Sequence, residues 1–360
     1  MKPIKLRALA HYLPQFHPIP ENDQWWGKGF TEWTNVTKCT PRFAGHYQPH
    51  LPTDMGFYDL RLEATRVAQA ELAKAYGIHG FCYYHFWFDG KTLLEQPAED
   101  LLASGKPDFP FCFCWANENW TRRWDGQDRE VLMQQRYSET DDVRHIEYLL
   151  PFFQDKRYIK VDGKAVFLVY RTEEIPEIEQ RAATWRKTAQ QYGMELYLIR
   201  VESFQAGVRP ESIGFDAALE FQPNWKKQLP IIRKNILVRA LHKFGIKESV
   251  YSKNKIIEYA DFVSLMLEKE TIDYKRFPCI TPMWDNSARR EKGALIIRNS
   301  TPEFYQKWLE KIIGRFEAPS PEENFIFINA WNEWAEGNHL EPCRKYGRGY
   351  LEATKAAFSK

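Results

Sequence analysis

Two glutamates stand three positions apart near the C-terminus, in the stretch Phe325-Ile-Phe-Ile-Asn-Ala-Trp-Asn-Glu-Trp-Ala-Glu-Gly337. The stretch begins with a short run of β-branched and aromatic residues, which predicts a buried strand. Glu333 and Glu336 follow this run together with Trp331 and Trp334. Cleavage of a glycosidic bond commonly uses two carboxyl groups, so these residue types at this spacing indicate chemistry on sugars.

The spacing of Glu333 and Glu336 leaves their relative orientation open. If the chain turns helically after the strand, residues three apart share a face, with Cβ atoms about 5–6 Å apart. Their carboxyl groups could then approach the roughly 5–5.5 Å separation of retaining glycosidases. If the chain stays extended, an odd spacing places them on opposite faces. An arbitrary pair of this kind is more often a cap and a surface residue, but the tryptophans favour a catalytic pair here.

Eight short apolar runs alternate with helical patterns along the 360 residues. Such alternation predicts an α/β fold with a parallel sheet, and polar or aromatic residues after strand upon strand predict the mouth of a (β/α)8 TIM barrel. A doubly wound sheet is the alternative, but no Gly-x-Gly-x-x-Gly follows a strand. We expect one barrel domain over residues 1–360, with strands at 5–12, 80–88, 109–115, 165–170, 195–200, 217–221, 277–285 and 325–328.

Two segments interrupt the alternation. Residues 20–56 form a long N-terminal loop rich in Trp, Gly and Pro. Residues 224–275 form a second, basic insertion that we expect to be helical, because residues 226–255 carry nine Lys or Arg against the single acid Glu248, with apolar residues interleaved. A solvated helical excursion is one interpretation. The other is a basic amphipathic surface for an anionic membrane or a lipid-linked glycan phosphate.

Polar and aromatic residues near the predicted strand ends are candidates for sugar contacts. Aromatic faces stack on apolar sugar faces as well as packing cores, and 15% of the residues are aromatic. Carboxylates at strand ends could bind a hydroxyl, orient a neighbour or do chemistry. A lone histidine is more often a satisfied structural residue than a ligand. The substrate-binding candidates are His11, Tyr12, Trp33, Tyr84, His85, Trp115, Asn117, Glu118, Trp120, Glu220, Trp284, Asn332 and Trp334.

The composition, with 44% hydrophobic residues, is that of a globular protein. The net charge of +2 argues neither for nor against a nucleic-acid partner, and we expect none. The N-terminus lacks an uninterrupted apolar run and no later run is long enough to span a membrane. This predicts a cytoplasmic protein, peripheral to the inner membrane if the basic segment binds lipid. The six cysteines are then expected to be free thiols. Cys112 and Cys114 lack a second pair at zinc spacing, so we expect no metal site.

Four motifs follow one another along the chain: His11-Tyr-Leu-Pro-Gln-Phe-His-Pro18, Gly29-Phe-Thr-Glu-Trp-Thr-Asn35, Trp115-Ala-Asn-Glu-Asn-Trp-Thr-Arg122 and Asn329-Ala-Trp-Asn-Glu-Trp-Ala-Glu-Gly-Asn-His-Leu-Glu-Pro342. Together they resemble the WbsX-type family, which is labelled glycosyltransferase and associated with O-antigen and other surface-polysaccharide loci. The resemblance covers nearly the whole chain.

More distantly, Asn332-Glu-Trp-x-Glu-Gly337 is similar to the catalytic motif of the endo-α-1,2-mannosidase family of (β/α)8 glycoside hydrolases. That family is retaining and needs no metal. The similarity implies that Glu333 assists the substrate 2-hydroxyl in forming a 1,2-anhydro sugar and that Glu336 is the general acid/base. Ala335 stands where the mannosidases have a histidine.

The transferase label and the paired glutamates imply different enzymes. A sugar-nucleotide transferase should show a nucleotide-binding fold and often an Asp-x-Asp, and this chain has no Asp-x-Asp. We therefore expect an enzyme that acts on glycosidic bonds of a bacterial surface polysaccharide of the O-antigen or lipopolysaccharide type. It would be a retaining glycoside hydrolase or transglycosylase without a cofactor. The alternatives are a sugar-nucleotide-dependent glycosyltransferase and a non-catalytic barrel that only binds glycans.

Overall fold

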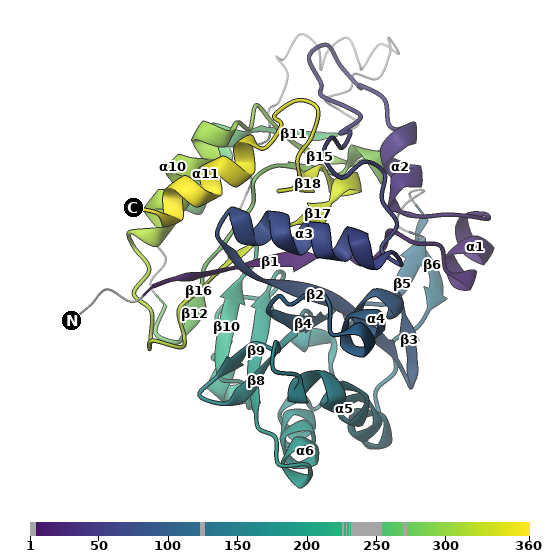
Figure 1. Cartoon of the computed structure of the whole chain (residues 1–360), viewed down its shortest axis with the longest axis vertical. Helices are drawn as coiled ribbons and strands as arrows, with labels where there is room; N and C mark the ends of the chain where they lie inside the picture. Colours follow the sequence, from purple (N-terminus) through teal and green to yellow (C-terminus); the bar gives the residue numbers. More distant parts are fainter. Residues whose placement is uncertain are drawn as a thin grey trace, which may run out of the picture.

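Parallel strands form a nearly closed barrel at the centre of the protein, in a computed structural model that describes residues 5–122, 127–224, 227, 229, 231, 254–268 and 272–360 (Figure 1). The strand order is β12-β10-β9-β8-β4-β2-β1-β16-β13, and every neighbouring pair is parallel. The end strands, β12 (Arg276–Phe277) and β13 (Cys279–Ile280), are separated in the chain by Pro278 alone. Because proline has no N–H to donate, it divides one barrel strand into these two pieces. The (β/α)8 TIM barrel is confirmed.

The barrel strands coincide with the eight predicted apolar runs, with one correction. The run at 277–285 is not a single strand, because its end, β14 (Trp284–Asp285), pairs antiparallel with β15 (Leu295–Arg298) in a separate sheet. The third strand of that sheet is β11 (Lys255–Glu258). The other barrel strands are β1 (Arg7–Tyr12), β2 (Ile78–Phe88), β4 (Phe111–Trp115), β8 (Lys164–Val169), β9 (Leu196–Glu202), β10 (Ala217–Glu220) and β16 (Phe325–Ile328).

Helices surround the ring, and their ends carry the expected caps. The Ser138 side chain accepts a hydrogen bond from the Asp141 N–H at the start of α5, and Thr301 does the same for Phe304 at the start of α10. In Figure 1, α3 runs across β1 and α10 lies beside α11. The helices are α3 (Glu63–Ala75), α4 (Gln96–Ser104), α5 (Glu139–Gln154), α6 (Ile178–Gln191), α9 (Tyr259–Met266), α10 (Pro302–Ile313) and α11 (Gly349–Phe358).

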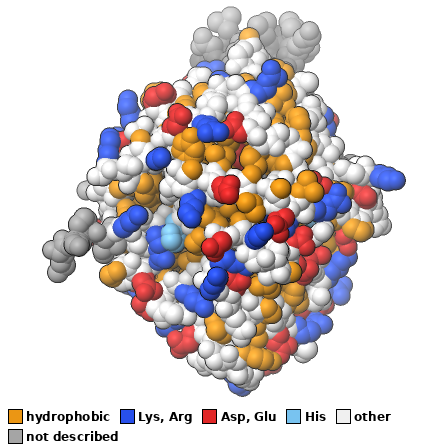
Figure 2. All heavy atoms as spheres, viewed as in Figure 1, with side chains coloured by type: hydrophobic (Ala, Val, Ile, Leu, Met, Phe, Trp, Pro, Cys, Tyr) orange, Lys and Arg blue, Asp and Glu red, His pale blue; other side chains and the backbone are white. Residues whose placement is uncertain are grey.

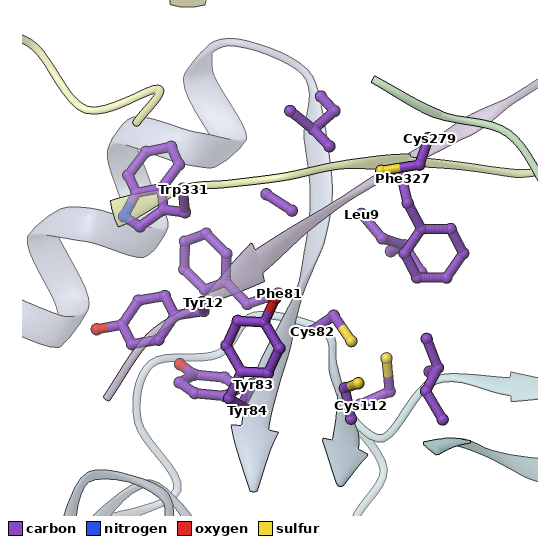
Figure 3. Close-up of a cluster of buried hydrophobic side chains, with 14 of the residues drawn as sticks. Leu9, Tyr12, Phe81, Cys82, Tyr83, Tyr84, Cys112, Cys279, Phe327 and Trp331 are labelled. Carbon is purple, nitrogen blue, oxygen red and sulfur yellow. The ribbon is translucent and has the colours of Figure 1, made fainter. Parts of the chain in front are cut away.

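Side chains alternate between the barrel interior and the helix layer, as strand geometry requires. His11 points inward, where its ring stacks on Tyr84 at 5.4 Å and lies near Phe327. Tyr12, the next residue, packs against Phe81 on the other side of the sheet (Figure 3). All six cysteines are buried free thiols, as expected. This alternation decides which residues at the strand ends reach the mouth of the barrel.

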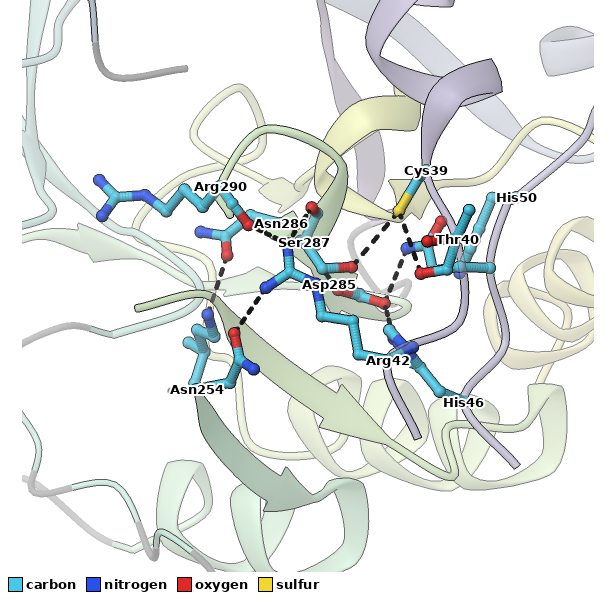
Figure 4. Close-up of polar contacts among 12 residues, drawn as sticks. Cys39, Thr40, Arg42, His46, His50, Asn254, Asp285, Asn286, Ser287 and Arg290 are labelled. Carbon is cyan, nitrogen blue, oxygen red and sulfur yellow. Dashed lines mark hydrogen bonds and ion pairs between the residues drawn. The ribbon is translucent and has the colours of Figure 1, made fainter. Parts of the chain in front are cut away.

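The long N-terminal segment, 20–56, contains two short helices, α1 (Pro20–Trp26) and α2 (Glu32–Lys38). Its Arg42 side chain ties it to the β14–β15 sheet, donating from Nη1 to Asn254 Oδ1 at 2.6 Å and from Nη2 to the Ser287 carbonyl at 2.7 Å (Figure 4). The segment is therefore anchored to this sheet.

The basic stretch 226–255 lies outside the described residues except for positions 227, 229, 231, 254 and 255, so its expected helical structure and membrane contact stay predictions. On the face drawn in Figure 2, acidic and basic side chains are interspersed among hydrophobic ones. Among the described helices, none has both the length and the apolar character needed to cross a membrane.

Candidate active site

A cavity of about 790 Å³ lies at the carboxyl ends of the barrel strands. This is the end at which (β/α)8 enzymes carry their active sites. Four residues that directly follow barrel strands line it, namely Leu13, Ala116, Tyr170 and Phe221, together with Tyr84 of β2 and Glu333, which follows β16 by a few residues. The cavity is therefore the place to look for chemistry.

The two glutamates reach this cavity through a short, well-anchored turn. β17 (Asn332–Glu333) pairs with β18 (Asn338–His339), and a 3-10 turn, Trp334–Glu336, connects them. Side chains three apart eclipse in a 3-10 helix, so Glu333 and Glu336 both line the cavity. Of the two orientations left open by the sequence, the helical one is present.

Two further residues fix the ends of this turn. The Asn332 side chain accepts a hydrogen bond from the Leu13 N–H at 2.7 Å and donates to the Leu13 carbonyl at 3.0 Å, which joins the turn to the segment after β1. Gly337 has a φ of 53°, and a Cβ at this position would lie 3.0–3.2 Å from Asp285 atoms. A side chain there would be both strained and crowded, so the sequence Glu-Gly at this point is a structural requirement.

The carboxyl groups of the pair have different surroundings. Glu333 is buried, and burial raises its pKa well above the usual range, with further increases from the charge of Glu336 and a hydrogen bond to it. Arg289 acts in the opposite direction. Glu336 accepts a hydrogen bond from Arg289 Nη1 at 2.7 Å. The surroundings of Glu333 therefore favour its protonated form more than water does.

A second carboxylate completes the surroundings of Arg289. Its Nη2 donates to Glu32 Oε1 at 2.7 Å, and the same oxygen accepts from the Ala335 N–H at 3.1 Å. Glu32 is fully buried and comes from α2, in the motif Gly29 to Asn35. Sequence reasoning gave Glu32 no role and did not find Arg289.

On the opposite rim, Arg171 forms a second charged group. Its Nη1 donates to Glu118 Oε1 at 2.6 Å, and its guanidinium lies 4.0 Å from the centroid of the Phe204 ring. Asn117 holds this arginine in place, since it accepts from the Arg171 N–H at 2.8 Å and donates to the Arg171 carbonyl at 2.9 Å. Asn117 thus supports the rim rather than lining the cavity.

Four of the predicted substrate-binding residues line the cavity with the two glutamates: Tyr84, Glu118, Trp120 and Trp284. Trp120 belongs to β5 (Trp120–Arg122), which pairs with β6 (Gln127–Met133). Its ring packs edge-on against Phe86 at 5.1 Å and is only partly buried. A partly exposed indole at a cavity wall is a suitable platform for a sugar ring.

Three predicted contacts are corrected because their side chains face the helix layer. The Tyr12 hydroxyl donates to Gln69 of α3 at 2.6 Å, and His85 Nε2 lies 2.9 Å from His145 Nε2 of α5. Trp115 Nε1 donates to the Trp87 carbonyl at 3.3 Å. Successive side chains of a strand point to opposite faces of the sheet, and each of these three residues directly follows one that points into the barrel. Its own side chain therefore points away from the cavity.

The remaining predicted contacts lie beneath or beside the cavity. Trp334 Nε1 donates to Glu341 Oε2 at 2.7 Å, and Trp33 packs behind it at 5.5 Å. His11 is buried under Tyr84, where burial lowers its pKa to about 3. Three more of the predicted substrate-binding residues do not line the cavity: Asn332, Asn117 and Glu220. Glu220 accepts a hydrogen bond from Gln222 Nε2 at 3.2 Å. Trp334, Trp33 and His11 do not line the cavity either.

Several cavity residues were missed, and two of them had a signal in the sequence. Gln15 belongs to the motif His11 to Pro18, and Tyr170 ends a predicted strand, which is where functional residues of a barrel gather. Phe204, Arg289 and Arg290 lie in irregular segments without periodicity. The missed lining residues that bear on the site are Gln15, Tyr170, Arg171, Phe204, Arg289 and Arg290.

Comparison with solved structures shows what this architecture resembles. A protein described as "Glycoside hydrolase-like protein" superposes with a TM-score of 0.61 at 14% identity, covering 99% of this chain and 94% of that one. The GH99 endo-alpha-mannosidase from Bacteroides thetaiotaomicron superposes with a TM-score of 0.57 at 13% identity, covering 98% and 96%. At these identities the likeness concerns the fold.

Sequence relatives point to a family. Proteins called "Uncharacterized protein WxcX" from two strains of Xanthomonas campestris pv. campestris are 42% identical over 354 residues, which is 98% of this chain and 49% of each relative. The chain thus spans about half the length of these curated relatives. The family model described as "Glycosyltransferase WbsX" matches residues 8–354. Because the match covers nearly the whole chain, the protein belongs to the glycosyltransferase WbsX family.

Proposed function

We propose that the protein cleaves or transfers glycosidic bonds of a bacterial surface polysaccharide of the O-antigen or lipopolysaccharide type, using Glu333 and Glu336. The observation that carries the proposal is the pair of carboxyl groups that one short 3-10 turn brings to the wall of the barrel-mouth cavity. One member is buried with a raised pKa and the other is paired with an arginine. A proton donor beside a carboxylate is the equipment that glycosidic-bond cleavage needs.

The closeness of the two carboxyl groups favours a retaining reaction. Inverting enzymes separate their carboxyl groups by about 6.5–9.5 Å to admit a water molecule, whereas retaining enzymes hold them at about 5–5.5 Å. Glu333 and Glu336 lie three residues apart on one 3-10 turn, and the charge of Glu336 acts on Glu333, so the pair fits the closer spacing better. We therefore propose retention, with hydrolysis if water reaches the intermediate and transglycosylation if a sugar hydroxyl does.

The second candidate is a sugar-nucleotide-dependent glycosyltransferase. The family description favours it, and basic side chains at the cavity wall, among them Lys255 and Arg290, could meet a diphosphate. A third outcome, a barrel that binds glycans without turnover, is distinguished by the same experiment.

A product screen tests these candidates. Purified protein is incubated with fragments of bacterial surface polysaccharides and, separately, with sugar nucleotides and acceptors, and products are identified by mass. Hydrolysis adds the mass of water to each cleaved fragment, transglycosylation gives elongated chains, and nucleotide-dependent transfer releases a nucleoside diphosphate. The Glu333→Gln/Glu336→Gln double variant is the control. Release of the nucleotide without cleavage of any glycan would overturn the proposal.

We further propose that the enzyme works in the cytoplasm at the inner membrane, through residues 226–255. Six reduced cysteines suit a reducing compartment, and nine cationic residues against one acid suit an anionic lipid surface. Flotation with anionic liposomes should recover the protein at low salt and lose it at high salt, because salt screens the charges. Equal recovery with neutral liposomes would remove this part of the proposal.

A further inference from the structure

Arg289 lies between two carboxylates, and only one of them belongs to the proposed catalytic pair. We propose that Arg289 and Glu32 are positioning residues, which hold Glu336 as the ionised carboxylate and leave Glu333 as the proton donor. This rests on the proposed function. It reverses the roles that the similarity to the mannosidase motif implies, in which Glu336 is the acid.

The geometry around Arg289 forms a closed triangle. One arm of the guanidinium donates to Glu336 and the other to Glu32, each at 2.7 Å. Glu32 in turn accepts from the Ala335 N–H, in the same 3-10 turn that carries Glu336. Because the guanidinium is planar and hydrogen-bonded on two sides, it cannot rotate without breaking at least one of the two bonds. Glu32 therefore fixes the arginine and the backbone beside Glu336 at once.

The charges of Arg289, Glu32 and Glu336 determine which carboxyl group of the pair is protonated. The Glu32 side chain is 0% exposed and that of Arg289 is 14% exposed, so these charges are poorly screened. Burial raises the pKa of Glu32, and Arg289 and the Ala335 N–H act against that rise. With Glu32 and Glu336 both ionised, the two carboxylates and Arg289 sum to one negative charge. The groups that act on Glu333 are Glu336, Arg289 and Glu32, and the phenols of Tyr84 and Tyr170 also face it. A further negative charge on buried Glu333 would be uncompensated, whereas its protonated form adds none.

The loop that carries Arg289 is itself held from the N-terminal segment. The Arg42 guanidinium donates to the carbonyl groups of Ser287, Arg290 and Glu291, on both sides of Arg289 (Figure 4). Within the loop, Asn286 Oδ1 accepts from the Leu295 N–H at 2.8 Å. Glu32 and Arg42 both belong to the segment 20–56, so this segment has a function in setting the charge state of the pair.

The roles define the reaction. In the first step the bond from the anomeric carbon to the leaving oxygen breaks, its electron pair stays on that oxygen, and the oxygen takes the proton of Glu333. The Glu336 carboxylate supplies an electron pair to the anomeric carbon and forms a glycosyl ester. In the second step water, or an acceptor hydroxyl, attacks this carbon and gives its proton to Glu333, and Glu336 leaves as the carboxylate.

The pH–rate profile of Arg289→Met tests the proposal. The acid limb of kcat/KM reports the group that must be ionised. Removing a positive charge at 2.7 Å from Glu336 should move this limb upward by about one pH unit or more. Glu32→Gln should move it less, and Arg289→Lys, which keeps the charge, should restore most of it. Arg209→Met, at an exposed ion pair with Asp273, is the matched control and should leave the profile unchanged.

An activity loss in Arg289→Met with an unmoved acid limb would overturn the proposal, because a purely structural role predicts that result. NMR titration of 13C-carboxyl-labelled glutamates supplies a readout that does not need turnover. The resonance that disappears in Glu333→Gln should titrate at higher pH than the one that disappears in Glu336→Gln. The reverse order would also overturn the proposal. If no glycoside is turned over but the expected NMR order is found, the proposed function fails and the positioning roles stand.

Discussion

Replacing Gly337 by alanine should lower the stability of the protein, because the turn after Glu336 needs a residue with a positive φ and has no space for a side chain. Gly337 has a φ of 53°, where an alanine is strained by about 1 kcal/mol relative to glycine. In addition, the new Cβ would lie 3.0 Å from Asp285 Cβ, 3.1 Å from its carbonyl oxygen and 3.2 Å from its nitrogen. Two of these neighbours are backbone atoms, which cannot rotate away, so overpacking should add about 1–3 kcal/mol.

Gly347 offers a matched control, because its φ is also 53° and a Cβ there would meet nothing within 4 Å. We expect Gly347→Ala to cost about 1 kcal/mol and Gly337→Ala about 2–4 kcal/mol. For a chain of 360 residues, with an unfolding entropy of about 2.1 cal/mol/K per residue, the losses correspond to falls in melting temperature of about 1 °C and about 3–5 °C. Calorimetry of the two variants checks this. Equal losses would refute the crowding against Asp285.

Two further changes separate binding from stability and report a buried carboxyl group. Trp120→Ala should raise KM by about tenfold with kcat little changed, because it removes a partly exposed aromatic ring at the cavity wall. Trp115→Ala should instead lower the free energy of unfolding by about 3–5 kcal/mol, because Trp115 is buried against the helix layer. Steady-state kinetics and thermal melts of both variants make the comparison, and an unchanged KM for Trp120→Ala would remove its role. Glu341 is buried and its pKa is raised to about 7, so the folded state favours its neutral form and stability falls as the pH rises from about 4.5 through 7. Between pH 4.5 and 7 the free energy of unfolding of the wild type should fall by about 3 kcal/mol relative to that of Glu341→Gln, whose side chain does not titrate. A difference in unfolding free energy between the two proteins that stays constant from pH 5 to 8 would contradict this.

The barrel itself could be predicted from the sequence because its strands are marked locally. Runs such as Phe111 to Trp115 are short, apolar and rich in aromatic or β-branched residues, and helical patterns separate them. The split of the seventh strand at Pro278 was not predicted, although proline in a strand is a known interruption. Closure of the ring, by contrast, depends on pairing between β13 and β16 and could be inferred only from the fold class.

The site could be predicted only in part, because a polar and aromatic cluster at the end of a strand contains some side chains that point into the barrel and others that point to the helices. Tyr84 faces the cavity and His85, its neighbour, faces α5. Applying the two-residue alternation to each strand would have excluded Tyr12, His85 and Trp115. Arg289 and Glu32 had no such signal. They stand 257 positions apart, Glu32 at the start of α2 and Arg289 in an irregular loop, and their pairing exists only after the N-terminal segment folds onto the β14–β15 sheet.

The leaving-group dependence of the two glutamine variants tests the central claim most directly. Glu333→Gln and Glu336→Gln are assayed on one glycoside with an unactivated sugar leaving group and on the matching aryl glycoside, whose departure needs little proton transfer. Glu333→Gln should lose several orders of magnitude on the first and far less on the second, since it removes the acid. Glu336→Gln should be damaging on both, since it removes the carboxylate that acts at the anomeric carbon. Turnover that survives both substitutions on the unactivated substrate would contradict catalysis by this pair.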